Sequence, residues 1–415
     1  MNVVYALKFR FQYATFDLDF IANPAYVEAM SEKLRFTCPD PPAPRAAAVS
    51  GSLLCATRYG ALGASSRLRL AQYIPHLSQA IQIEHRPFLQ DDYLRALYGG
   101  RFRALPAARA YLRVAGLRAA IRRHDLLWIE KELLPWLPHQ AERILMGGTP
   151  YILDFDDAWA LRYADSPSRL VRAALGHKFT HLLRGSALTI VANETLYHWA
   201  SAEGARNILL LPTVVDLARY PLLPAPDGPF TIGWIGTPLT AAYLDALAAP
   251  LRQLAAEAPL KLLVIGAPGY TLPGVEVESQ PWSEANESAL IARCHAGIMP
   301  LPDSEWANGK SGYKLIQYMA MARPAIASPV GANNRIVNSG ETGFLAADAL
   351  AWLQNLRALR DSPDLRARMG AAARRRAERH YSLGVTAPVL LETLTELLGN
   401  IAERRAKTPF ARLAR

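Results

Sequence analysis

The chain has 415 residues, of which 51% are hydrophobic and 20% are charged. This size and balance predict a globular protein of two or three domains, and they exclude a collagen-like, low-complexity or mostly disordered chain. Lysine and arginine outnumber aspartate and glutamate by 46 to 36, so the net charge is +10. Such an excess favours phosphates, anionic lipids or nucleic acid as partners, although an arginine-rich genome also produces it.

Three cysteines lie far apart, at Cys38, Cys55 and Cys294. Their odd number and wide spacing argue against a disulfide framework or a zinc site and favour a reducing compartment. No apolar run approaches the roughly 18 residues that span a bilayer, and charged residues interrupt the first 23. We therefore expect a cytoplasmic protein, and contact with a membrane surface stays open.

Residues 1–50 are an N-terminal extension of unknown role that ends near a proline-rich stretch. From residue 51 onward, short apolar runs alternate with helical stretches. This alternation predicts a parallel sheet that is covered by helices on both faces. The strands are expected at 52–57, 125–130, 151–155, 187–192 and 208–211.

Four prolines and one glycine between residues 220 and 229 mark a domain boundary. The alternation then begins again, with a helix expected at 240–258, one at 283–294 that Ser283 caps, and one at 312–322. The second set of strands is expected at 230–236, 261–266, 275–278, 296–301 and 324–328.

The pattern thus predicts an α/β protein of two Rossmann-like, doubly wound domains, 51–222 and 223–385, that face each other across a cleft. A crossover helix and a basic tail follow at 386–415. Ligands of such sheets bind outside the carboxyl ends of the strands, so the loops after the strands are where functional residues are expected.

The loop that precedes the expected helix at 312–322 has the strongest signal for a ligand. Gly309 and Gly312 allow close approach of the backbone, and Lys310 and Lys314 lie four residues apart at the start of the helix. Free N–H groups at a helix start attract anions, so this loop predicts a phosphate or pyrophosphate site. A solvated helix cap is the alternative reading, and the spacing is not that of a P-loop.

Two further loops carry weaker signals for the same ligand. Gly331 and Asn333 lie in the next strand-to-helix loop, where an ordinary cap explains them equally well. In the first domain, the loop that contains Ser65, Ser66 and Arg67 follows the first strand and predicts contact with a phosphate or a sugar, with a plain turn as the alternative.

Acidic residues end two strands of the first domain. Glu130 and Glu132 either orient sugar hydroxyls or form a salt-linked surface turn. The pair Asp154 and Asp156 has three readings: a metal site, the acid pair of a dehalogenase-type phosphatase, or a cap. We favour the reading in which Asp156 and Asp157 cap the next helix and line the cleft, since no other cluster of metal-ligand residues stands out.

Three segments of the chain carry a resemblance to a known family. The run GYKLIQYMAMARPAIASPVG at 312–331 resembles the helix, strand and glycine loop of the donor domain in family 4 (group 1) glycosyltransferases, which have the GT-B fold. The segments LPTVVD at 211–216 and ETGFL at 341–345 are similar to that family as well.

The resemblance implies transfer of a sugar from a nucleotide-sugar to a glycan or lipid-linked acceptor, usually with retention and without a metal, in cell-surface polysaccharide biosynthesis. It implies no cofactor, because the nucleotide-sugar is a substrate, and no nucleic-acid partner is expected. The acceptor is expected on the first domain and the nucleotide on the second, and the last helices are expected to cross back. Contact with the inner face of a membrane remains open.

On this reading each candidate residue has a role. Lys314, Lys310 and Arg67 neutralise the leaving diphosphate, and Asp156 and Asp157 complete the catalytic set. The acceptor-binding residues are Ser65, Ser66, Glu130 and Glu132. The donor-binding residues are Gly236, Thr237, Trp282, Gly312, Gln317, Gly331 and Asn333, among which Gln317 holds the ribose and Trp282 either stacks on the base or lies in the core.

The sequence also departs from the family. Two glutamates separated by seven residues are common there, but Gly309 and Gln317 occupy those places here. The loop after the first donor-domain strand, 236–240, has no basic residue. Two alternatives therefore stay open: a catalytically impaired subunit that binds nucleotide, and a sugar-nucleotide epimerase or hydrolase.

Overall fold

The computed structural model describes residues 51–101 and 103–407, which belong to one compact unit, 48–415. The extension at residues 1–50 and the end of the basic tail after residue 407 lie outside the described residues. In the helices of the described part, no segment is both long and apolar enough to cross a membrane.

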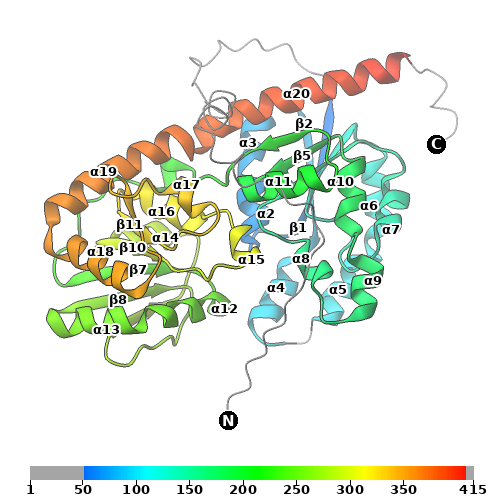
Figure 1. Cartoon of the computed structure of the whole chain (residues 1–415). Coiled ribbons are helices and arrows are strands. Elements are labelled where there is room, and N and C mark those ends of the chain that lie inside the picture. The colour runs from blue at the N-terminus through cyan, green and yellow to red at the C-terminus, as the bar shows by residue number, and fades with distance from the viewer. Residues whose placement is uncertain (1–50, 102, 408–415) are drawn as a thin grey trace, which may run out of the picture. The chain divides into compact units, whose positions relative to one another are not determined.

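The first sheet is parallel and has the strand order β2-β1-β3-β4-β5-β6 (Figure 1). Its strands are β1 (Ser52–Tyr59), β2 (Gln82–Leu89), β3 (Leu126–Glu130), β4 (Tyr151–Phe155), β5 (Leu188–Val191) and β6 (Ile208–Leu210). Its helices are α2 (Ala64–Arg69), α3 (Ile74–Leu77), α4 (Asp91–Tyr98), α5 (Ala104–Leu112), α6 (Val114–Ile121), α7 (His139–Met146), α8 (Leu161–Ala164), α9 (Arg169–Leu175), α10 (Lys178–Gly185) and α11 (Glu194–Ala202).

Both faces of this sheet are buried. Leu53 and Leu54 are neighbours in β1, yet they belong to different apolar clusters, because successive side chains of a strand point to opposite faces. This is the burial that the continuous apolar runs predicted.

The second sheet repeats the architecture, with the order β12-β11-β10-β7-β8-β9. Its strands are β7 (Phe230–Ile235), β8 (Leu260–Ile265), β9 (Glu276–Gln280), β10 (Ala296–Met299), β11 (Ala325–Ala327) and β12 (Gly343–Leu345). Its helices are α12 (Pro238–Ala241), α13 (Ala248–Glu257), α14 (Glu287–Ala292), α15 (Glu305–Asn308), α16 (Tyr313–Ala320), α17 (Asn333–Ile336), α18 (Ala349–Asp361) and α19 (Pro363–His380).

The predicted α/β fold of two Rossmann-like domains is therefore confirmed, and the ten expected strands are present with ends that differ by at most two residues. Two strands were missed. β2 contains Pro87 and alternates irregularly, which an edge strand tolerates because only β1 pairs with it. β12 has only three residues, too few for a clear pattern.

Two helix predictions need correction. The helix expected at 240–258 is divided into α12, a 3₁₀ segment at Ala242–Leu247, and α13. Ser283 does not cap α14: the helix begins at Glu287, and Ser283 instead accepts a hydrogen bond from the backbone N–H of Asn286 in the turn before it.

The last helix, α20 (Leu383–Lys407), packs on the first sheet domain, as the resemblance implied (Figure 1). Leu390 and Leu394 join the apolar cluster that contains Leu53. The hydroxyl groups of Tyr73 and Thr386 are 2.9 Å apart. The second domain is thus joined to the first by two segments, the linker before β7 and the junction of α19 with α20.

Candidate active site

The carboxyl-end loops of the two sheets touch each other. The side-chain amide of Asn193, after β5, donates hydrogen bonds to the carbonyl oxygens of Gly309 (2.9 Å) and Lys310 (3.1 Å). A Cβ atom on Gly309 would lie 2.5 Å from the Cβ of Ala158 and 2.8 Å from its backbone nitrogen. Only glycine permits this approach, which explains why the carboxylate common in the family has no place at residue 309.

Both lysines of the predicted phosphate loop lie beside tryptophan rings. The Nζ atom of Lys310 is 5.5 Å from the ring centre of Trp306, and that of Lys314 is 5.6 Å from the ring centre of Trp234. Burial and then the charge of Lys310 lower the pKa of Lys314 to about 8, although Asp157 acts in the opposite direction. Because the two ammonium groups repel each other, both would gain from an anionic ligand.

Asp157 is the acidic group of the first domain that acts on these lysines. Burial and the neighbouring Asp156 raise its pKa, while Lys310, Lys131 and Lys314 lower it. The structure therefore brings together Lys310, Lys314 and Asp157, three residues that the sequence placed in the catalytic set.

Tight turns hold the glycine loops against each other. Gly312 has φ +68° and begins α16, and a Cβ there would overlap the side chain of Ile336. Gly331 has φ +51°, and a Cβ there would overlap the carbonyl of Asn308. Both positions need glycine because of the left-handed backbone and the close contact. Asn333 is buried and donates to the carbonyl of Ser328 (3.0 Å), so it holds the loop and does not face a ligand.

The start of the second sheet contributes a small turn. Gly236 follows β7 and donates its N–H to the carbonyl of Ile265 (2.9 Å). Thr237 caps the short helix α12 together with Thr240. Both residues lie at the carboxyl end of β7, where the sequence placed them.

Gln317 is buried, and its amide donates to the hydroxyl of Tyr220 (3.4 Å). That hydroxyl donates in turn to Glu287, which also accepts a hydrogen bond of 2.7 Å from the indole N–H of Trp282. Glu287 is a buried carboxylate near Gln317 that the sequence analysis missed. The predicted helix began at Ser283, four residues before the observed start of α14 at Glu287, so that prediction did not place Glu287 at the start of a helix.

Arg67 reaches the second domain. Its guanidinium carbon is 5.0 Å from the ring centre of Trp282, and its Nε is 3.6 Å from Glu284. The cation lies over the indole, and the partly buried ring also packs against the apolar cluster that contains Leu315 and Ile316. The core interpretation of Trp282 therefore holds in part, and the ring is not free for a base in this arrangement. Among the described residues, the buried Nε of Arg67 and Oε1 of Glu130 make no hydrogen bond.

Ser65, Ser66, Glu130 and Asp156 converge at the carboxyl ends of β1, β3 and β4, but they contact one another. Ser66 donates to the carboxylate of Glu130. The Nζ atom of Lys131, a residue with φ +63°, is 2.9 Å from both Ser65 Oγ and Asp156 Oδ1. Lys131 was not predicted as a site residue, although it lies between the two glutamates in sequence.

The acceptor-binding role predicted for Glu130 and Glu132 needs correction, because neither side chain has exposed surface. Glu132 pairs with Arg58 and, at 2.6 Å, with Lys178, and it accepts hydrogen bonds from Tyr163. These cations come from segments distant in sequence, so the pattern around the glutamates gave no sign of them.

The helix-capping reading of Asp156 and Asp157 is also wrong. The next helix, α8, begins four residues later and has no side-chain cap. Asp154 bonds Arg69 at 2.7 Å, so cations partner both carboxylates of the Asp154–Asp156 pair. Within residues 51–101 and 103–407, no group of three or more His, Cys, Asp or Glu residues is arranged to hold a metal ion.

Comparison with known proteins supports this reading of the second domain. Residues 229–362 match the model of the family "Glycosyl transferases group 1". A search of curated protein sequences gives no match.

Several solved structures have a similar fold at low sequence identity. Sucrose-phosphate synthase from Thermosynechococcus elongatus is 16% identical with a TM-score of 0.61, over 84% of this chain and 100% of that one. HepE from Anabaena, solved with UDP-glucose, is 14% identical with a TM-score of 0.61, and the match covers 83% of this chain and 100% of that one. A glycosyltransferase from Rickettsia africae is 13% identical with a TM-score of 0.59, over 85% and 100%.

The family match covers the loops that carry Lys310, Lys314, Gly312 and Gly331, and the structural matches extend over both sheets. The resemblance to group 1 glycosyltransferases of the GT-B fold is therefore confirmed, and it supports a transferase enzyme.

Proposed function

We propose that this protein transfers a sugar from a nucleotide-sugar to a glycan or lipid-linked acceptor, with retention and without a metal, in polysaccharide biosynthesis. The observation that carries the proposal is the pair Lys310 and Lys314, held in the family-matched segment opposite Asp157. A nucleoside diphosphate is the leaving group of such a reaction, and two lysines at its position stabilise the charge that develops on it.

The second domain would hold the donor. Backbone N–H groups near Gly236, Gly312 and Gly331 would contact the diphosphate, and Gln317 would lie near the ribose. Arg67 would approach from the first domain, so the donor would be enclosed only when the two domains are close together. Such enclosure aligns donor and acceptor and makes their reaction effectively intramolecular.

A thermal-shift panel of nucleoside diphosphates and their sugar conjugates tests this proposal. HepE was solved with UDP-glucose, so uridine nucleotides are the first probes. A ligand present at about 100 times its dissociation constant adds about 2.7 kcal/mol to the free energy of unfolding. We expect one base to raise the melting temperature by several degrees. If no nucleotide in the panel changes it, the donor assignment is wrong.

The second candidate is a subunit that binds nucleotide without turnover, which the absence of carboxylates at Gly309 and Gln317 favours. An epimerase or hydrolase of the same fold is the third. Product analysis separates them: a transferase releases little free sugar without acceptor, a hydrolase releases it steadily, and an impaired subunit releases none under any condition.

A basic surface on the first domain supports a lipid-linked acceptor at a membrane. Residues 93–124, which include most of α4 and all of α5 and α6, contain eight arginines and no acidic residue. Leu105 and Leu112 project from α5 with 56% and 83% of their surface exposed, and Arg109 lies between them on the same helix face. Exposed leucines among arginines are typical of a surface that binds anionic lipid.

Vesicle sedimentation tests this contact. We expect the protein to bind vesicles that contain phosphatidylglycerol and not pure phosphatidylcholine, and binding should weaken with salt because the charges are exposed. The variant Leu105→Ser/Leu112→Ser should bind several-fold less. Leu350→Ser, a control at an equally exposed leucine of the second domain, should bind like the wild type. Equal binding to both lipids would contradict the prediction.

A further inference from the structure

A pocket in the second domain lies away from the carboxyl-end loops. Its volume is about 480 Å³, which is within the range of pockets that bind small molecules. It is lined by His295, directly before β10, and by Pro324, directly before β11, so it lies at the amino ends of these strands. The nucleotide site proposed above lies at their opposite ends, and the two sites are therefore distinct.

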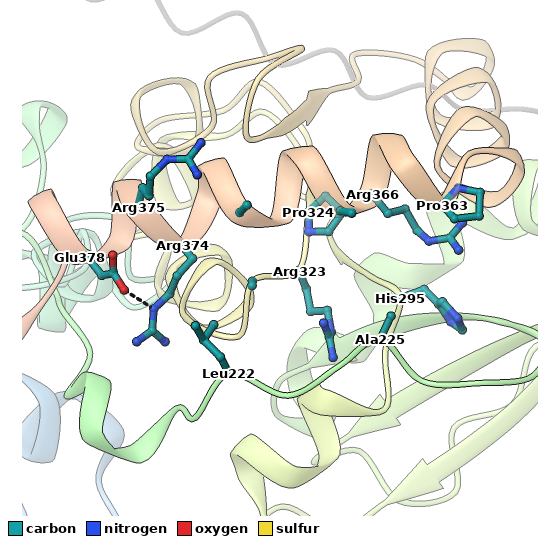
Figure 2. A pocket seen from close by; sticks show the side chains of 13 residues that line it. Leu222, Ala225, His295, Arg323, Pro324, Pro363, Arg366, Arg374, Arg375 and Glu378 are labelled. Carbon is teal, nitrogen blue, oxygen red and sulfur yellow. Dashed lines mark hydrogen bonds and ion pairs between the residues drawn. The ribbon is translucent and has the colours of Figure 1, made fainter.

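The pocket is built from the segments that connect the two domains. Figure 2 shows Arg323 and Arg374 directed toward Leu222 and Ala225 of the linker, below helix α19. The same helix leads into α20, which packs on the first domain. A ligand in this pocket would contact both the linker and helix α19, the two segments through which the domains are connected.

Four arginines line this pocket, namely Arg323, Arg366, Arg374 and Arg375, against one acidic residue, Glu378. Glu378 pairs with Arg374 at 2.7 Å. The remaining lining is largely alanine, proline and leucine, so no other carboxylate of the lining neutralises the arginines.

Backbone carbonyls accept hydrogen bonds from only some of the N–H donors of these arginines. Arg323 donates from one terminal nitrogen to carbonyls of the linker and of Ala292, and Arg366 donates from one nitrogen to the carbonyls that end α18. Arg323 is 5% exposed, and its Nε has no hydrogen-bond partner in the described part of the chain. Burial lowers the pKa of Arg323 and of Arg366. A buried donor without a partner is unfavourable, and an anionic oxygen would satisfy it.

We propose that this pocket binds a small phosphate-bearing molecule. Arginine is suited to phosphate because its planar group offers several N–H donors in a fixed arrangement. The apolar part of the lining, which is Leu222, Ala225, Ala367 and Ala371, leaves room for an organic portion beside the phosphate. This assignment does not depend on the sugar-transfer proposal.

Calorimetric titration with inorganic phosphate and with glucose 1-phosphate tests the site on three variants that each lower the net charge by one. Ala371→Glu places a carboxylate at an exposed position of the lining, and Arg375→Gln removes an arginine for which the described residues provide no hydrogen-bond or ion-pair partner. Arg368→Gln is the control, since Arg368 is exposed on the same helix but does not line the pocket.

We expect Arg375→Gln to weaken binding about tenfold to 100-fold, the effect of one hydrogen bond to a charged group. Ala371→Glu should weaken it because the new carboxylate repels the phosphate, and Arg368→Gln should leave it unchanged. A donor-site variant, Lys314→Met, should also leave binding at this pocket unchanged. Binding that is lost in Lys314→Met but kept in Ala371→Glu would overturn the proposal, because the phosphate would then occupy the cleft.

Three other results would also overturn it. The first is that neither probe binds. The second is that Arg368→Gln weakens binding as much as the two lining variants do, which would indicate an unspecific charge effect. The third is that the protein binds phosphatidic-acid vesicles but neither soluble probe. The last result would identify a lipid headgroup as the source of the phosphate. Loss of nucleotide binding at the cleft would not bear on the pocket, so the failures of the two proposals are distinguishable.

Discussion

Replacing Lys314 with methionine is expected to lower turnover about 100- to 1,000-fold, the usual effect of removing one group that stabilises charge in a transition state. The same change should not lower the melting temperature. Burial and the charge of Lys310 lower the pKa of this lysine, so its ammonium form reduces the stability of the folded protein. Uncharged methionine of similar length removes that cost, as is common for functional residues.

Turnover with donor and acceptor, affinity for the nucleoside diphosphate, and thermal unfolding together check this prediction. Lys261→Met is the matched control: this lysine lies on β8, is 28% exposed and pairs with Glu276 at 3.2 Å. Its loss should change turnover by less than about twofold, because Lys261 lies at the amino end of β8, away from the carboxyl-end loops, and its exposed ion pair adds little stability. If Lys314→Met keeps full activity, the assignment of Lys314 to the candidate active site is wrong.

The pKa of Lys314 also gives the reaction a pH dependence. The ammonium form is complete well below pH 8 and is lost as the pH rises through about 8. Because this pKa is that of the protein without donor, kcat/KM for the donor should fall above pH 8 in the wild type. The folded state binds fewer protons at Lys314 than the unfolded state between pH 8 and the ordinary lysine value, so this group makes the fold more stable as pH rises through that window.

Replacing Glu132 with glutamine is expected to lower the free energy of unfolding by about 3–5 kcal/mol, the cost of breaking a buried ion pair from one side. Arg58 and Lys178, like Glu132, have side chains at most 3% exposed, and both would lose their shared carboxylate. Urea denaturation measures the change. Glu276→Gln, at a carboxylate that is 64% exposed, should cost less than about 1 kcal/mol.

The sign of the pH effect adds a second check. Burial alone would raise the pKa of Glu132, but Arg58 and Lys178 bring it below its ordinary value. The carboxylate therefore stabilises the fold above the ordinary glutamate range, and this stability is lost as pH falls through the folded-state pKa. The difference between wild type and Glu132→Gln should shrink in acid. A constant difference would contradict the ion-pair explanation.

The site could be predicted in part. Lys310, Lys314, Gly312 and Gly331 lie in one continuous segment after a strand, and local pattern and the resemblance both led to them. Glu130 and Glu132 were assigned to the acceptor because they end a strand, yet both are buried. Arg58 in β1 and Lys178 in α10 neutralise Glu132. Both are distant from Glu132 in sequence, so the residues around Glu132 did not predict these pairs.

Local sequence was enough to predict the two parallel sheets and the glycine-rich loop that carries Lys310 and Lys314, because each depends on apolar runs, glycines or motif residues within a few positions of one another. The tertiary structure decided which charges face a ligand and which face each other. In each domain, the parallel strands bring together segments that are distant in sequence. Glu287 comes near Gln317 in the second domain, and Lys131 pairs with Asp156 in the first. The arginine pocket likewise exists only where the linker, the start of β11 and α19 meet, because burial and charge pairing follow from neighbours in space.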